Sequence, residues 1–74
     1  MAQILQTLVL NETIVVGSFK VEVDRRLKVE ALKFDNGEIK VKYTNEKLQT
    51  SYVASPIPKE YSKIVWQKAQ QQIK

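Results

Sequence analysis

Between residues 3 and 55, apolar and polar residues mostly alternate, which is the pattern of β-strands with one buried side. The run from 4 to 10 is rich in aliphatic side chains and stops at Asn11, so it predicts a first strand. Residues 13–23 alternate more regularly and predict one long strand. Gly17 lies in its middle, which favours a bulge or bend at that point.

A turn at Asp24-Arg25-Arg26 leads into residues 27–34, where the pattern supports two interpretations. Leu27, Ala31 and Phe34 fit one face of a helix, whereas alternate apolar residues fit a strand whose phase shifts near Ala31. We interpret the segment as a strand with a kink or bulge near Ala31, because the residues that follow form a hairpin with it.

The hairpin has the clearest local signal in the chain. The dipeptide Asn36-Gly37 is typical of a two-residue type I′ turn, because both positions need positive backbone dihedrals. This turn predicts a register in which Phe34 lies opposite Ile39 and Leu32 lies opposite Val41. These apolar pairs agree with a shared buried side.

A turn over 44–47 and a strand over 48–53 are expected next, and then the period changes. Tyr61, Ile64, Val65 and Ala69 recur at helical spacing after Pro58, so a helix is predicted over about 58–72. The predicted fold is mainly β (α+β) in a single small domain spanning 1–74. It is a strongly bent antiparallel sheet or open barrel of about five strands with one C-terminal helix.

The residue types argue against catalysis. The chain has no histidine and no cysteine, and its two glycines stand apart, so no phosphate-binding loop is present. Nucleophilic and general-base chemistry and most metal sites draw on those side chains or on clustered carboxylates. We therefore expect no enzymatic activity, no cofactor and no metal.

The charge balance favours an anionic partner. Twelve basic residues and eight acidic residues give a formal net charge of +4 and a pI near 9.5. No apolar run approaches the length of a membrane span, so we expect a cytoplasmic protein without a membrane partner. A core this small, without disulfides or metals, is commonly stabilised by self-association, and this makes a homodimer a reasonable expectation.

The predicted hairpin places Lys33 directly opposite Lys40, with Lys42 further along the same outward side. A side that tolerates facing lysines would suit phosphates, although ordinary solvated lysines on an edge would give the same pattern. Tyrosines could stack on unpaired bases, or they could simply border the core. The candidate nucleic-acid-binding residues are Lys33, Lys40, Lys42, Arg25, Arg26, Lys28, Tyr52 and Tyr43.

The leading hypothesis from the sequence is a small non-catalytic nucleic-acid-binding protein that uses a basic sheet face. The alternative is a protein-interaction subunit or small regulator that docks a larger protein through its C-terminal helix or a strand edge. Trp66 and Ile73 widen the apolar side of that helix and are the candidate partner-interface residues. Trp66 closing one end of the core is an equally good interpretation.

Overall fold

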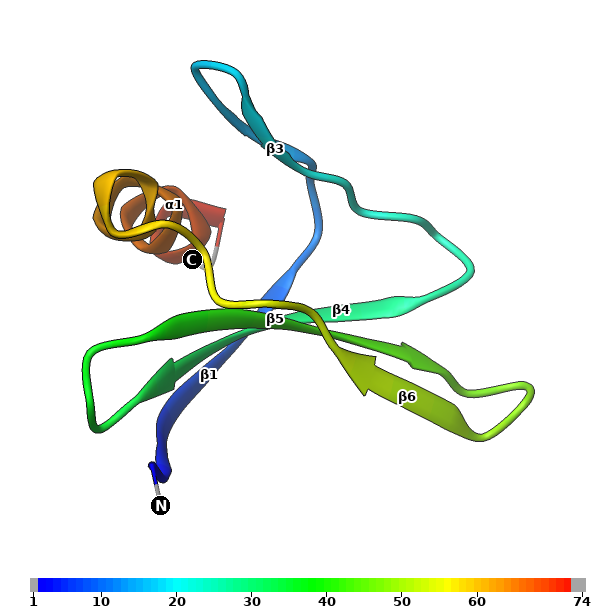
Figure 1. Ribbon diagram of the computed structural model, residues 1–74. Helices are drawn as coiled ribbons and strands as arrows, with labels where there is room; N and C mark the ends of the chain where they lie inside the picture. The colour runs from blue at the N-terminus through cyan, green and yellow to red at the C-terminus, as the bar shows by residue number, and fades with distance from the viewer. Residues whose placement is uncertain (1, 73–74) are drawn as a thin grey trace.

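The computed structural model describes residues 2–72, and these contain six strands followed by one helix. In chain order the elements are β1 (Ile4–Leu10), β2 (Ile14–Val16), β3 (Phe19–Val21), β4 (Lys28–Phe34), β5 (Ile39–Asn45), β6 (Thr50–Val53) and α1 (Lys59–Gln72). An open antiparallel sheet has the order β1-β4-β5-β6, and β2 and β3 form a separate hairpin (Figure 1). The predicted mainly β fold with an antiparallel sheet and a C-terminal helix is confirmed.

The β2–β3 hairpin and α1 lie on the same side of the sheet (Figure 1). One hydrophobic core fills the space between these two elements and the sheet. Each element contributes aliphatic side chains that water would otherwise surround, so their burial drives this arrangement. The buried core residues are Leu8, Leu10, Ile14, Val16, Val21, Val29, Ala31, Ile39, Val41, Ile57, Val65, Trp66 and Ala69.

The turn between β4 and β5 has three residues rather than the two that were predicted. The N–H of Phe34 donates to the carbonyl of Glu38 at 2.9 Å, and the N–H of Gly37 donates to the carbonyl of Phe34 at 3.1 Å. Gly37 has a φ of +89°, as expected for a three-residue loop that ends in a left-handed residue. The Asn36 side chain holds this loop, because its Oδ1 accepts from the N–H of Glu38 at 3.0 Å.

The longer turn shifts every predicted pair in this hairpin by one residue on β4. Ile39 lies opposite Lys33 instead of Phe34, and Lys40 lies opposite Leu32 instead of Lys33. The predicted register is therefore wrong. Because side chains alternate between the two sides of a sheet, a shift of one residue moves each partner to the other side.

No kink interrupts β4 near Ala31, in contrast to the prediction. The pairing with β5 runs without a register shift from Lys28 to Lys33. The apolar phase changes because Ala31 and Leu32 are both buried, at 0% and 3% exposure, although they point to opposite sides of the sheet.

Residues 13–23 form a hairpin rather than the single long strand that was predicted. β2 and β3 are joined by Gly17-Ser18, with Val16 opposite Phe19. Gly17 has a φ of +57°, which suits the first position of a two-residue turn. A two-residue loop pairs positions three apart, so the buried parity changes from even residues in β2 to odd residues in β3.

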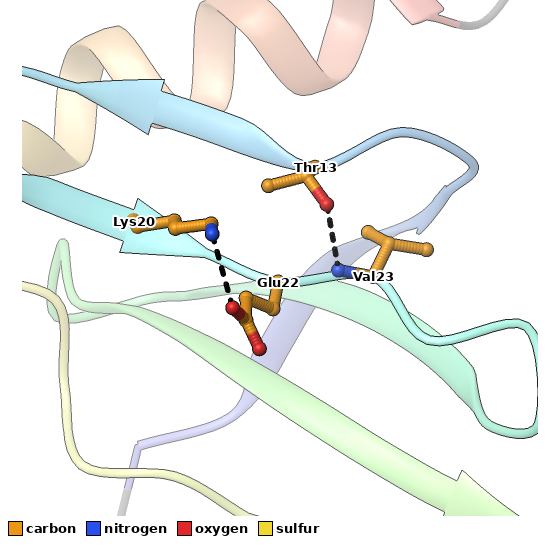
Figure 2. Close-up of polar contacts among 4 residues, drawn as sticks. All are labelled: Thr13, Lys20, Glu22 and Val23. Atoms are coloured by element: carbon orange, nitrogen blue, oxygen red, sulfur yellow. Dashed lines mark hydrogen bonds and ion pairs between the residues drawn. The ribbon is translucent and has the colours of Figure 1, made fainter.

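Polar contacts secure the open end of this hairpin (Figure 2). The N–H of Val23 donates to Oγ1 of Thr13 at 3.1 Å, and this bond joins the two ends of the hairpin just beyond β2 and β3. Lys20 and Glu22 form an ion pair at 3.0 Å on the exposed side of the hairpin. Such an exposed pair contributes little stability, so the hairpin depends mainly on its buried aliphatic residues.

The predicted turn at Asp24-Arg25-Arg26 is present, because the N–H of Leu27 donates to the carbonyl of Asp24 at 3.0 Å. The turn after β5 falls two residues later than predicted, over 46–49, and leaves Leu48 exposed outside β6. Gln49 in this turn has a φ of +55°, a left-handed conformation that a non-glycine residue rarely adopts.

The predicted helix is confirmed by α1, which starts directly after Pro58. The N–H of Ile57 donates to the carbonyl of Ile39 at 2.9 Å, and its side chain is buried, so the chain is fixed to β5 before the helix begins. The helix buries Val65, Trp66 and Ala69, whereas Ile64, predicted on the apolar face, is 42% exposed. No helix in the described part of the chain is long and apolar enough to cross a membrane.

The end of α1 is bonded to the segment between β1 and β2. Oε1 of Gln72 accepts from the N–H groups of Asn11 and Glu12, at 2.9 and 3.1 Å. Nε2 of Gln72 donates to the carbonyl of Glu12 at 2.9 Å. One side-chain amide therefore satisfies three backbone groups about sixty positions away in the sequence.

Candidate functional site

The sheet has one side that contributes nothing to the core. Leu8, Leu10, Val29, Ala31, Ile39 and Val41 supply the sheet's part of the core, and alternation along each strand puts the residues between them on the opposite side. We call this opposite side the open face. Its residues are Ile4, Thr7, Val9, Lys28, Glu30, Leu32, Phe34, Lys40, Lys42, Thr44, Ser51 and Val53.

A small apolar centre lies on the open face. Leu32 is 3% exposed, yet it is separate from the hydrophobic core, so it is covered by its neighbours on the open face. Thr7 and Lys40 lie directly opposite it on the two adjacent strands. Phe34 is half-buried beside this centre, and Nζ of Lys40 lies 5.0 Å from the centroid of its ring. The aliphatic stem of a lysine can cover apolar neighbours in this way while its ammonium group stays in water.

Three lysines follow the open face from one end of β4 to the middle of β5. Lys28 is exposed, and Lys40 and Lys42 are half-buried. Glu30 lies opposite Lys42 in the register, but within residues 2–72 the ion pair that forms is between Lys20 and Glu22 on the hairpin. The ammonium groups of the open face are thus available to an anion from solution.

Lys33 lies on the other side of the sheet from Lys40, so the predicted facing pair of lysines is wrong. Lys33 is opposite Ile39, on the side that carries α1, and its Nζ lies 5.8 Å from the centroid of the Trp66 ring. It lines a groove of about 520 Å³ between α1 and the hairpin turn, together with Lys63 and Gln67. Lys33 and Lys40 lie on opposite sides of the sheet because the three-residue turn shifts Lys33 to the inner side.

Tyr43 and Tyr52 also lie on the inner side of the sheet. They are opposite each other on β5 and β6, and their rings stack with centroids 5.1 Å apart. Burial raises the pKa of Tyr43, and Tyr52 and Glu22 raise it further. Tyr52 is 62% exposed. Neither ring shares a face with Lys40, and we do not assign them to the open face.

Arg25 and Arg26 belong to the turn before β4, where the N–H of Arg26 donates to Oδ1 of Asp24 at 2.9 Å. Both are exposed, and together with Leu27, Lys28, Glu46 and Lys47 they line a hollow of about 350 Å³ at one end of the sheet. Lys28 belongs to both surfaces, so the basic turn continues the line of lysines on the open face.

Trp66 is 6% exposed and packs in the hydrophobic core, which excludes it as an exposed docking residue. The alternative interpretation, in which it closes the core, is the one found. Its indole Nε1 is buried without a hydrogen-bond partner in the described part of the chain. Ile73, the other residue predicted for a partner interface, lies outside the described residues.

Phe34 is the functional candidate that sequence reasoning missed, because a two-residue turn would have placed it inward opposite Ile39. The triplet Asp35-Asn36-Gly37 is the signal that could have identified it, since a glycine in third place suits a three-residue loop. Residues 2–72 contain no cluster of three or more histidine, cysteine or acidic side chains that could hold a metal ion. No protein-family model, curated protein or solved structure matches the chain.

Proposed function

We propose that this chain is a small non-catalytic nucleic-acid-binding protein that holds a single strand on its open face. The observation that carries the proposal is the line of Lys28, Lys40 and Lys42 on a sheet face that the core does not use. Single-strand binders combine such positive surfaces with aromatic rings on which bases stack. Phe34 is the ring at this place, and Arg25 and Arg26 extend the positive surface at the end of the sheet.

The contact between Lys40 and Phe34 suggests how one nucleotide would be held. In the free protein the Lys40 ammonium group lies over the aromatic ring, a weakly attractive arrangement at this half-buried site. A phosphate would attract the same ammonium group more strongly and draw it off the ring. The ring would then be free to stack on the adjoining base, which contributes about 1–3 kcal/mol per base.

The test is a fluorescence-anisotropy titration of labelled oligonucleotides of about 20 residues, single- and double-stranded, at about 50 and 200 mM salt. We expect tighter binding of the single strand and weaker binding at the higher salt. No binding at low salt, or binding that salt leaves unchanged, would contradict the proposal, because phosphate contacts release counterions.

A charge-matched pair of variants locates the site. The first carries Lys40→Glu and Lys42→Glu on the open face, and the control carries Lys59→Glu and Lys63→Glu on the exposed side of α1. Each change lowers the formal charge by two, so both variants have a charge of zero instead of +4. The first should lose at least about tenfold in affinity and reduce the salt slope by about 1.4, as two lost phosphate contacts require. Equal losses in both variants would mean that net charge alone governs binding.

Phe34→Leu separates stacking from charge. Leucine keeps an apolar side chain beside Leu32 but removes the ring, so affinity should fall by about fivefold or more while the salt slope stays constant. A thermal melt of each variant checks that folding is retained. The alternative function, docking a larger protein through α1, has less support because Trp66 is buried.

A further inference from the structure

β1 leaves backbone hydrogen-bonding groups unused along one side. The N–H of Phe34 donates towards β5, and the bonding direction alternates along a strand, so Lys33 bonds towards β1, where Gln6 lies opposite it. By the same alternation the N–H and C=O groups of Thr7 and Val9 point away from the sheet. Within residues 2–72, β1 pairs with β4 alone, and no hydrogen bond ends on these outward groups.

The side chains of β1 do nothing to keep another strand away. Residues 4–10 include no charged residue and no proline, which are the usual means of protecting a sheet edge. A bulge at Leu5 is the one irregularity, and residues 6–10 pair regularly beyond it. Ile4, Leu5 and Val9 are 51%, 65% and 41% exposed, so the edge is also bordered by apolar surface.

We propose that β1 pairs antiparallel with β1 of a second copy of this chain, so that two four-stranded sheets join into one. The strand matches itself in length and has no charge, so two-fold pairing brings no like charges together. β1 offers seven residues of edge, whereas β6, at the other edge of the sheet, has four. Two copies therefore form the longer ladder by pairing along β1.

Pairing of this kind would place both open faces on the same side of a continuous sheet. The two-fold axis runs perpendicular to the sheet, so neither copy is turned over. The dimer does not depend on nucleic-acid binding. If both proposals hold, one single-stranded nucleic acid could contact the open-face lysines of both copies. The two linked sites would then bind it more tightly than either site alone.

The first measurement is sedimentation equilibrium of the intact protein over a wide range of concentration. We expect the mass to rise from 8.6 kDa to twice that value as the concentration increases. Thr7→Pro removes one outward N–H without touching a bond to β4, and proline is tolerated at an edge position of this kind. It should weaken the dimer by at least about tenfold, whereas Thr7→Val, which keeps the N–H, should not.

The second measurement is amide hydrogen exchange in the unmodified protein, which remains decisive if Thr7→Pro fails to fold. The N–H groups of Thr7 and Val9 should exchange at least about tenfold more slowly at high concentration than at low concentration. A monomer at every concentration, or a dimer in which these two amides exchange as rapidly as at low concentration, would overturn the proposal. Equal dimerisation of Thr7→Pro and Thr7→Val would do the same.

Discussion

Replacing Gln72 with alanine removes the side chain that joins the end of α1 to the segment between β1 and β2. Three hydrogen bonds are lost, two that Asn11 and Glu12 donate to Oε1 and one that Nε2 donates to the carbonyl of Glu12. A hydrogen bond contributes about 0.5–1.5 kcal/mol net, and the exposed backbone groups can bond to water instead, so the lower value applies. The free energy of unfolding should fall by about 1.5 kcal/mol, which is a decrease in Tm of about 6–12 °C for a chain of this size.

The assay is urea unfolding followed by the fluorescence of the single tryptophan, together with a thermal melt. Gln71→Ala and Gln70→Ala are matched controls, because both side chains are exposed on the same helix and form no hydrogen bond within residues 2–72. Each should change stability by less than about 0.5 kcal/mol. If Gln72→Ala unfolds at the same urea concentration as these controls, the contact does not hold α1 in place and the reasoning fails.

Two further predictions concern backbone conformation and pH. Gly37→Ala should destabilise the protein by about 1–2 kcal/mol in urea unfolding, because alanine is strained at a φ of +89°, whereas Gln49→Gly should stabilise it by about 0.5 kcal/mol by relieving a φ of +55°. A loss of stability in both variants, or a gain in both, would contradict this prediction. The pKa of Tyr43 is raised above its ordinary value of 10.0 in the folded protein. The contribution of the neutral Tyr43 side chain to stability is therefore complete below pH 10, and it is lost as the pH rises through the pKa that Tyr43 has in the folded state. Tm measured from pH 8 upwards should therefore fall more steeply for the wild type than for Tyr43→Phe, and parallel curves would exclude the effect.

The alternation and the change of period were enough to predict the strand-rich fold and the position of the helix. Turn lengths were not predictable in the same way, because several turn types accept the same residues. Asn36-Gly37 suits a two-residue turn, but the bond that the N–H of Glu38 donates to the Asn36 side chain stabilises a loop that includes Asp35. One residue of difference in the turn decided which lysines share a face.

The apolar pattern also fails where both sides of a strand are covered. Leu32 is buried on the open face by its neighbours, and its presence next to Ala31 produced the prediction of a kink that does not exist. Gly17-Ser18 presents a related difficulty, because the exposed Val15 has the same parity as the buried residues of β3 and so extends their alternation across the chain reversal. Lys40 and Lys42 alternate on the same strand, so their sharing one side of the sheet does not depend on the register.

The β2–β3 hairpin has a consequence for the rate of folding. β1 and β4 are neighbours in the sheet, yet residues 11–27 separate them in the chain, and closing such a loop opposes folding entropically. The hairpin forms within that connection and brings Thr13 to within 3.1 Å of the backbone of Val23. This shortcut roughly halves the effective length of the loop and lowers its closure entropy by about 0.6 kcal/mol. A variant that cannot make the reversal at Gly17 should therefore refold more slowly, with β1 as the last strand to be added.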